Sequence, residues 1–168
     1  MKKIMIIGCG GAGKSTFARK LGDALGISVH HLDSLFWKKG WVPTEREEWK
    51  AALSDVMSEN SWIMDGNYGS TMDIRLKEAD TIIFLDYSTL TCLYGAVSRR
   101  IKYHGRTRPD MGEGCPEKLD AEFLKWIALY RRDKAPVIRQ TLSQLKGKKV
   151  FIFENRKQTH HFLNLCRR

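Results

Sequence analysis

One stretch, "GCGGAGKS" at residues 8–15, constrains this chain more than any other. It matches the pattern G-x-x-x-x-G-K-[ST] and stands between a short apolar run, residues 3–8, and a helical pattern over residues 14–26. Its glycines let the backbone turn tightly enough for successive N–H groups to point at a bound phosphate, and the dipole of the following helix favours the same anion. Lys14 and the Ser15 hydroxyl then suit the β- and γ-phosphates of a nucleotide and its Mg²⁺. We predict that ATP and Mg²⁺ bind at Gly8, Gly10, Gly11, Ala12, Gly13, Lys14, Ser15 and Thr16.

Strand and helix patterns alternate along the rest of the chain, which predicts an α/β fold with a parallel sheet. Further apolar runs indicate strands at residues 27–33, 61–66, 80–86 and 148–155. Helical spacing of apolar residues marks residues 44–60, 90–102, 120–132 and 135–145. Thr44 and Glu47 have the spacing of a capping box at the start of the first of these helices. No internal repeat or linker interrupts the pattern, so we expect one domain over residues 1–168.

Charge and cysteine content indicate which partners and which cellular compartment suit the protein. Residues 1–90 carry 11 Lys/Arg and 12 Asp/Glu, whereas residues 91–168 carry 18 and 7, so the basic second half suits an anionic partner. Nucleotide phosphates and nucleic acid both fit that description. The four cysteines show no CxxC and no zinc spacing, so we expect free thiols in a reducing, cytoplasmic setting. No apolar run approaches the ~20 residues of a membrane span, so we expect no membrane association. The sequence is compatible with either a monomer or a dimer.

Three aspartates, Asp33, Asp65 and Asp86, end predicted strands at the edge where open α/β sheets bind ligands. A Mg²⁺ ion needs a carboxylate near the phosphate loop, and phosphoryl transfer to a hydroxyl needs a base. We assign Asp65 to metal or substrate contact and Asp33 to the role of base or acceptor-orienting group. Helix capping is the competing interpretation for all three, and for Asp86, which precedes Ser88 and Thr89, it is the one we favour.

The glycine-containing basic segment at residues 104–118 suits a lid. A lid must exclude water so that a phosphoryl group is transferred rather than hydrolysed. Arginines in and around it are expected to stabilise charge on the transferring group. A solvated basic face is the competing interpretation for each of them. We assign Arg106, Arg131 and Arg132 to catalysis, Arg99 and Arg100 to the nucleotide, and Arg108 to the acceptor.

Several other residues have both a binding and a structural interpretation. Trp37 belongs to an aromatic stretch that either stacks on a flat acceptor or covers the core. Arg75 either holds an anionic group of the acceptor or is a surface residue of a short helix. His30 and His31 lack metal-ligand spacing, so we expect them to be ordinary strand residues.

The order of these motifs resembles that of the adenylate-kinase-like P-loop kinases. The likeness rests on "GCGGAGKST", an aspartate after the second strand, "DGNY" after the third and "RRIKYHGRTRPD" before a lid, and covers nearly the whole chain. More narrowly, "HLDSLFWKKGWV", "SWIMDGNY" and "TRPDMGEGCPEKLDAEFLKW" are similar to the bacterial DNA topology modulation proteins.

This resemblance implies a three-layer αβα P-loop fold with strand order 2-3-1-4-5. It further implies a helical lid over about residues 99–132 and an acceptor-binding region over about residues 33–60. "DGNYGS" replaces the Gly-Phe-Pro-Arg turn of adenylate kinase, so the resemblance does not imply AMP as the acceptor. We assign Tyr68 of this turn to acceptor binding.

The sequence supports two classes of function. The first is a kinase that transfers the γ-phosphate of ATP to a nucleoside, nucleotide or similar small acceptor. The second is a nucleotide-gated DNA-binding protein that modulates DNA topology without kinase activity, although no helix-turn-helix or zinc-finger motif supports nucleic-acid binding. We favour the kinase, because phosphoryl transfer needs Asp33 and a lid whereas DNA binding uses neither.

Overall fold

Five parallel strands form one sheet in the computed structural model, which describes residues 1–167. They are β1 (Lys3–Gly8), β2 (Val29–His31), β5 (Trp62–Asp65), β6 (Thr81–Leu85) and β7 (Lys149–Phe153). The order across the sheet is β2-β5-β1-β6-β7. Counted within this sheet alone, that is 2-3-1-4-5, as predicted. The strand that leads into the phosphate loop is therefore central, with Ile4 beside Ile63 on one side and beside Thr81 on the other.

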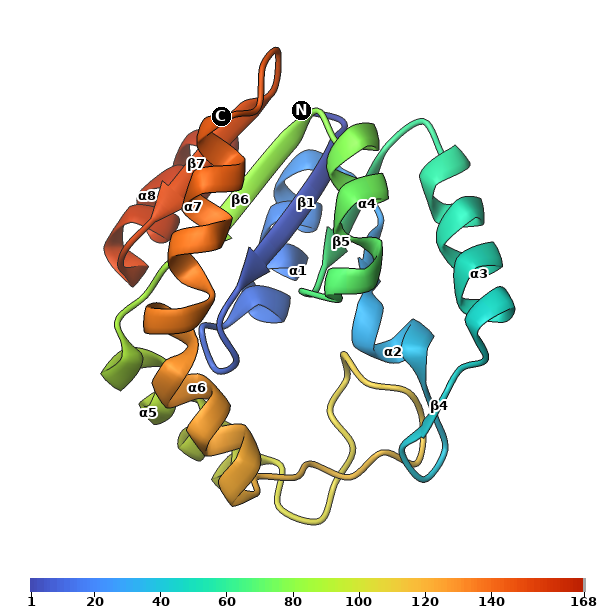
Figure 1. Ribbon diagram of the computed structural model, residues 1–168, viewed down its shortest axis with the longest axis vertical. Helices are drawn as coiled ribbons and strands as arrows, with labels where there is room; N and C mark the ends of the chain where they lie inside the picture. Colours follow the sequence, from blue (N-terminus) through green and yellow to red (C-terminus); the bar gives the residue numbers. More distant parts are fainter. Residues whose placement is uncertain (168) are drawn as a thin grey trace.

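Helices cover both faces of the sheet, which completes the three layers. Helices α1 (Lys14–Leu25) and α8 (Arg156–Cys166) pack against each other on one face, and α4 (Met72–Glu78) and α7 (Ala135–Ser143) cover the other (Figure 1). A strand covered on both faces needs apolar side chains pointing both ways. Accordingly Ile4, Met5, Ile6 and Ile7 are no more than 1% exposed. No helix within residues 1–167 is both long and apolar enough to cross a membrane.

The remaining elements lie toward the carboxyl ends of the strands, except the helix Arg46–Ser58, which runs beside the sheet so that Met57 O accepts from Lys3 Nζ at the start of β1 (Figure 1). They are α2 (Leu32–Phe36), the hairpin of β3 (Trp37–Lys38) and β4 (Val42–Pro43), α3 (Arg46–Ser58), the 3₁₀ turn η1 (Gly69–Thr71), α5 (Thr89–Lys102) and α6 (Ala121–Asp133). Residues 103–120, here called the α5–α6 segment, run from the end of α5 to the hairpin and back to the start of α6 (Figure 1). The hairpin, α2 and α8 are elements that the sequence did not predict.

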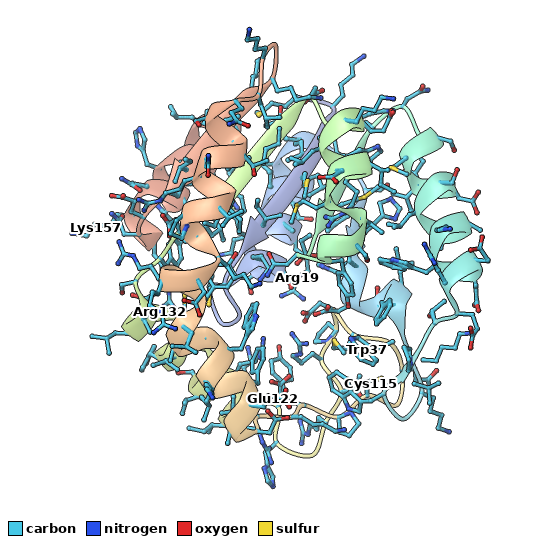
Figure 2. All side chains as sticks on the ribbon, viewed as in Figure 1. Arg19, Trp37, Cys115, Glu122, Arg132 and Lys157 are labelled. Carbon is cyan, nitrogen blue, oxygen red and sulfur yellow. The ribbon has the colours of Figure 1, made fainter. Side chains whose placement is uncertain are left out.

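Backbone contacts fix the α5–α6 segment on the hairpin. The Gly40 N–H donates to Gly114 O at 3.0 Å, and Trp41 Nε1 donates to Pro116 O at 3.2 Å. Trp37 and Cys115 lie close together where the two meet, and the Cys115 thiol donates to Lys38 O (Figure 2). The segment therefore closes over the carboxyl edge of the sheet instead of extending into solvent.

The capping box predicted at Thr44 and Glu47 is wrong. Helix α3 begins at Arg46, and Glu45 is its N-cap residue, without a side-chain cap. The Thr44 hydroxyl donates instead to Leu35 O, and the Thr44 N–H donates to Phe36 O at 2.8 Å. Thr44 thus ties the end of the hairpin to α2, because a hydroxyl can satisfy a backbone carbonyl as readily as it caps a helix.

The prediction that Asp86 caps a helix is also wrong. Ser88 is the N-cap of α5, and its hydroxyl accepts the Thr91 N–H. Asp86 is only 2% exposed and forms an ion pair with Arg139 of α7. A buried carboxylate needs a cation or several donors, and α7, which is distant in sequence, provides the cation.

Asp80 forms hydrogen bonds to the backbone at the start of the central strand, and its ionisation should make the stability of the fold depend on pH. Its carboxylate accepts the N–H groups of Lys2 at 2.8 Å and Lys3 at 3.1 Å. Burial alone would raise the pKa of Asp80, but hydrogen bonds from Thr81 and these two N–H groups lower it overall. We expect Asp80→Asn to lower the free energy of unfolding by about 1 kcal/mol at neutral pH.

Because the folded-state pKa of Asp80 is depressed, its contribution is present above the unfolded pKa of about 3.9 and is lost as the pH falls through the folded value. Urea unfolding of the wild type and Asp80→Asn should therefore differ at neutral pH and converge in acid. Asp23→Asn, an exposed change on α1, serves as the control. A difference that stays constant down to acid pH would contradict this account.

Candidate functional site

A cavity of about 910 Å³ lies between the carboxyl ends of the strands and the α5–α6 segment. It brings together most of the residues assigned from the sequence. Those that line it are Gly10, Gly11, Gly13, Lys14, Ser15, Thr16, Asp33, Trp37, Asp65, Tyr68, Arg99 and Arg108. The phosphate loop thus shares one space with the strand-end aspartates and with two of the predicted arginines.

The start of α1 is open to this cavity. The helix begins after Gly13, which has a φ of 87°, and no side chain caps it; its first turn has no acidic residue. Its free N–H groups and its dipole therefore favour an anion there. Lys14 lies across the loop and donates to Gly8 O at 2.9 Å and to Cys9 O at 3.0 Å. Desolvation lowers the pKa of Lys14, while the charges of Asp65 and Asp33 oppose that shift.

Two contacts fix the shape of the phosphate loop. Asn67 clamps Gly8, whose N–H donates to Asn67 Oδ1 at 3.1 Å and whose carbonyl accepts from Asn67 Nδ2 at 2.9 Å. Helix α5 approaches from the other side so closely that a Cβ on Gly95 would lie 2.1 Å from Gly11 O. Neither Asn67 nor Gly95 was predicted from the sequence. Asn67 stands in "DGNY", but its partner is 59 positions away.

Asp65 ends β5 at the cavity and is paired with a histidine. Its Oδ1 lies 2.5 Å from His31 Nδ1, and the carboxylate is only 4% exposed. Burial alone would lower the pKa of His31, but the hydrogen bond and charge of Asp65 raise it overall. His31 lies in strand β2, as predicted, but its pairing with Asp65 was not predicted. Strand register could have revealed the pair, since His31 and Asp65 are direct neighbours at the ends of β2 and β5.

The donor set at the loop fits a magnesium ion. Ser15 and Asp65 both line the cavity. Within residues 1–167 there is no group of three or more His, Cys, Asp or Glu residues that could hold a metal by itself. Mg²⁺ suits such a place, because it is usually bound by one or two protein oxygens together with phosphates and water.

Asp33 faces the cavity from α2 and is oriented by a tyrosine. The Tyr68 hydroxyl donates to Asp33 Oδ1 at 2.7 Å. Burial and the charge of Asp33 raise the pKa of Tyr68, so this hydroxyl stays a donor. The N-cap residue of α2 is His31, which means that Asp33 does not cap the helix. The carboxylate of Asp33 is 43% exposed and is free to meet a ligand.

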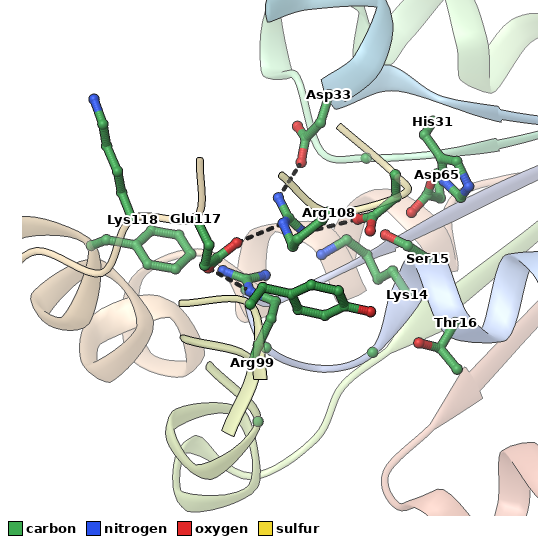
Figure 3. A pocket seen from close by; sticks show the side chains of 18 of the residues that line it. Lys14, Ser15, Thr16, His31, Asp33, Asp65, Arg99, Arg108, Glu117 and Lys118 are labelled. Carbon is green, nitrogen blue, oxygen red and sulfur yellow. Dashed lines mark hydrogen bonds and ion pairs between the residues drawn. The ribbon is translucent and has the colours of Figure 1, made fainter. Parts of the chain in front are cut away.

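Arg108 stands at the centre of an ion-pair network on the facing wall (Figure 3). Its Nη1 lies 2.8 Å from Asp110 Oδ2, its Nε 2.6 Å from Glu117 Oε2, and its Nη2 3.8 Å from Asp33 Oδ2. Glu117 also accepts from Arg99 Nε at 2.8 Å. Burial alone would raise the pKa of Asp110, but Arg108 and a hydrogen bond from Ser15 lower it. Asp110 and Glu117 were not among the predicted site residues.

Other predicted arginines lie outside the cavity lining. Arg106, Arg131 and Arg132 are exposed, and Arg132 pairs with its neighbour Asp133 (Figure 2). Arg100 is half-buried and contacts His104 Nδ1 at 2.6 Å. Helix periodicity places each of these on α5, α6 or the segment between them, but it does not say which of them face the cavity.

Arg75 is neither a ligand for the acceptor nor a surface residue. It is fully buried and does not line the cavity. Its guanidinium donates to Gly66 O at 3.0 Å, to Asn67 O, to Tyr68 O at 3.0 Å and to the Thr71 hydroxyl. Both predicted roles are therefore wrong. The turn that carries Asn67 and Tyr68 points its carbonyls inward, and Arg75 satisfies them.

Removing this guanidinium should destabilise the protein. We expect Arg75→Met to lower the free energy of unfolding by about 3 kcal/mol, because it leaves buried carbonyl groups without donors. Urea unfolding measures the loss, and Lys77→Met, an exposed change on the same helix, is the control. Equal stability of the two variants would contradict the role given to Arg75.

Comparison with known proteins identifies the fold. No protein-family model and no curated protein matches the chain. Among solved structures, a shikimate kinase from Bacteroides thetaiotaomicron is similar at 19% identity, covering 96% of this chain and 94% of that one, with a TM-score of 0.57. A shikimate kinase from Acinetobacter baumannii in complex with shikimate is similar at 17% identity, covering 98% of this chain and 92% of that one, with a TM-score of 0.58. A gluconokinase from Sinorhizobium meliloti 1021 is similar at 15% identity, covering 98% of this chain and 89% of that one, with a TM-score of 0.55. At these identities the likeness shows the fold, which is the predicted α/β P-loop fold.

Proposed function

We propose that this chain is a P-loop kinase that transfers the γ-phosphoryl group of ATP to a hydroxyl group of a small acceptor. One observation carries the proposal. The phosphate loop with Lys14, and a partly exposed carboxylate, Asp33, face each other across one cavity. A nucleotide-binding switch needs only the loop, whereas phosphoryl transfer needs a group that accepts the hydroxyl proton as well.

The phosphate loop and the start of α1 hold the nucleotide in this proposal. Backbone N–H groups of residues 10–16 surround the β-phosphate, and Lys14 exchanges the carbonyls of Gly8 and Cys9 for β- and γ-phosphate oxygens. Ser15 and Asp65 would hold Mg²⁺, Asp65 directly or through water. When bound, that ion neutralises charge on the β- and γ-phosphates.

Asp33 acts on the acceptor. The acceptor oxygen forms a bond to the γ-phosphorus, the bond from that phosphorus to the β–γ bridging oxygen breaks, and ADP leaves with the electron pair. Asp33 takes the proton of the attacking hydroxyl, and Tyr68 fixes the carboxylate by its hydrogen bond at 2.7 Å. Arg99 and Arg108, which line the cavity, stabilise charge on the transferring group.

The proposal gives the surrounding elements their roles. The α5–α6 segment, within the predicted region 99–132, acts as the lid that excludes water, and α2 with the hairpin, within the predicted region 33–60, forms the acceptor side. The blocks that resemble the bacterial topology modulation proteins include Asp33, Tyr68 and residues 107–120 of the α5–α6 segment. We therefore propose that the resembling segments of this chain serve phosphoryl transfer and not DNA binding. All four cysteines are free thiols, which supports a place in the cytoplasm.

An acceptor panel tests the kinase proposal. ADP release is measured with MgATP alone and with each of a set of nucleosides, amino alcohols, sugars and hydroxy acids. We expect release that depends on the acceptor and that falls by about 10²-fold or more in Lys14→Ala. Lys20→Ala, an exposed change on the same helix, should behave like the wild type. Turnover that is independent of every acceptor, or none at all, would count against a kinase.

A further inference from the structure

The turn that follows β5 contacts both halves of the site. We call residues 66–68 the β5 turn. The Asn67 side chain holds the phosphate loop, because Gly8 N–H donates to its Oδ1 at 3.1 Å and its Nδ2 donates to Gly8 O at 2.9 Å. The next residue, Tyr68, donates its hydroxyl to Asp33 Oδ1 at 2.7 Å. Two consecutive side chains therefore fix the loop on the nucleotide side and the carboxylate on the acceptor side.

The backbone of the β5 turn has a shape that its own residues do not favour. Tyr68 has a φ of 29° and a ψ of 79°, and residues other than glycine rarely adopt a positive φ. Such a backbone persists only where the surrounding structure holds it, and it is common at functional sites. Gly66 has a φ of 139°, and a Cβ there would lie 2.9 Å from the Leu32 Cβ. The turn therefore needs support from outside.

Arg75 of α4 supplies that support. Its guanidinium donates to Gly66 O at 3.0 Å, to Asn67 O at 2.5 Å and to Tyr68 O at 3.0 Å, which are the carbonyls of all three residues of the β5 turn. Its Nε donates to the Thr71 hydroxyl at 3.2 Å. A guanidinium can do this because its donors are spread along a rigid planar fork, whereas the donors of an ammonium group start from one point.

The burial of this cation indicates that it sets a conformation. Arg75 is 0% exposed, and no carboxylate among residues 1–167 forms an ion pair with it. Burial lowers its pKa to about 10, so the guanidinium still carries its charge at neutral pH. A buried charge is a poor source of net stability, and its best-attested benefit is the choice of one conformation over others.

We propose that Arg75 is a positioning residue for both halves of the kinase site, acting on the phosphate loop through Asn67 and on Asp33 through Tyr68. This deepens the proposed function, and the acceptor half of it rests on that function. Arg75 does not line the cavity, so it contacts neither the nucleotide nor the acceptor, and the transfer step is unchanged. A displaced β5 turn misplaces the loop and the base together, and a misplacement of about 1 Å can lower the rate by about 10²-fold.

A conservative variant gives the first test. Arg75→Lys keeps the charge but cannot bridge three carbonyls, so we expect the Kd of MgATP to rise by about tenfold and kcat with the best acceptor to fall by about tenfold. Calorimetry and steady-state kinetics measure the two effects under conditions where circular dichroism shows a folded protein. Lys77→Arg, an exposed change on the same helix, should alter neither. Thr71→Val, which removes the hydroxyl that accepts from Arg75, replaces Arg75→Lys if that variant does not fold.

Two double-mutant cycles show whether Arg75 acts through the β5 turn. Tyr68→Phe and Asn67→Ala each remove one side chain but keep the carbonyls to which Arg75 donates. In the Tyr68→Phe background, Arg75→Lys should lower kcat no further, and in the Asn67→Ala background it should raise the Kd of MgATP no further. Independent effects would multiply, to about 10²-fold in kcat in the first cycle. A residue that only stabilises the fold would not produce this pattern.

The outcomes separate the inference from the kinase proposal. A folded Arg75→Lys protein with the wild-type Kd and kcat, or losses that multiply in either cycle, would overturn the inference while leaving the kinase intact. No transfer to any acceptor by the wild type would overturn the kinase and with it the acceptor half of the inference. The MgATP cycle needs no turnover, so it decides the nucleotide half in either case.

Discussion

Replacing Gly95 with alanine is expected to weaken MgATP binding by about 10²-fold, although Gly95 is in a helix and outside the phosphate-loop motif. The added Cβ would lie 2.1 Å from Gly11 O, a backbone atom that cannot rotate away. A second approach between the same helix and the loop is equally tight, since a Cβ on Gly11 would lie 2.1 Å from Cys92 O. Helix and loop must then separate by about 1 Å, which is enough to misplace the N–H groups that surround a phosphate.

Calorimetric titration with MgATP measures this loss, and circular dichroism establishes that the variant is folded. Gly69→Ala is a matched control, because an added Cβ there has no heavy atom within 4 Å. We also expect Gly95→Ala to lose about 1–3 kcal/mol of stability, the usual effect of overpacking. A folded Gly95→Ala protein that binds MgATP as tightly as Gly69→Ala would show that the contact does not shape the loop.

Asp33→Asn is expected to lower kcat with the best acceptor by about 10²–10⁴-fold and to leave MgATP affinity nearly unchanged. Asparagine keeps the size of the side chain and can still accept the Tyr68 hydroxyl, but it cannot take a proton from the acceptor. The split between kcat and nucleotide affinity distinguishes a base from a residue that only supports the fold.

Two further variants near Asp33 test the same role, one with an expected partial loss of kcat and one as a control. Tyr68→Phe removes the hydroxyl that orients Asp33 and should lower kcat by about tenfold, because the base remains but is less well positioned. Ser34→Ala, an exposed change next to Asp33, should have no effect. Full activity of Asp33→Asn, or an equal loss of MgATP affinity, would remove Asp33 from the proposed role.

The sequence predicts the sheet and the phosphate loop well because both depend on local patterns. Apolar runs identify the five sheet strands, and the loop motif places Lys14 and Ser15 at the start of a helix. Asp33 and Asp65 are also predictable, since the ends of parallel strands meet at one edge of the sheet. In each of these cases a few consecutive residues contain the information.

The missed features depend on partners that are far apart in sequence. Arg75 and Asp86 are identified only when the turn carbonyls and Arg139 are placed against them. Asn67 reaches Gly8 across 59 positions. The surroundings of Arg108 are the clearest example. Arg108 looks like a free lid arginine in the sequence, and only the folded chain shows that three carboxylates surround it.

The distribution of the five tryptophans has a practical consequence for following the protein in solution. Trp37, Trp41 and Trp126 line the cavity, whereas Trp49 and Trp62 are 4% and 0% exposed. Indole emission responds to water and to nearby charges, and Trp41 has the Lys118 amine at 5.1 Å from its ring. The two buried indoles emit from an environment that a ligand does not reach and so give a constant background. Filling the cavity displaces water from the other three, so intrinsic fluorescence reports ligand entry on the unlabelled wild-type chain.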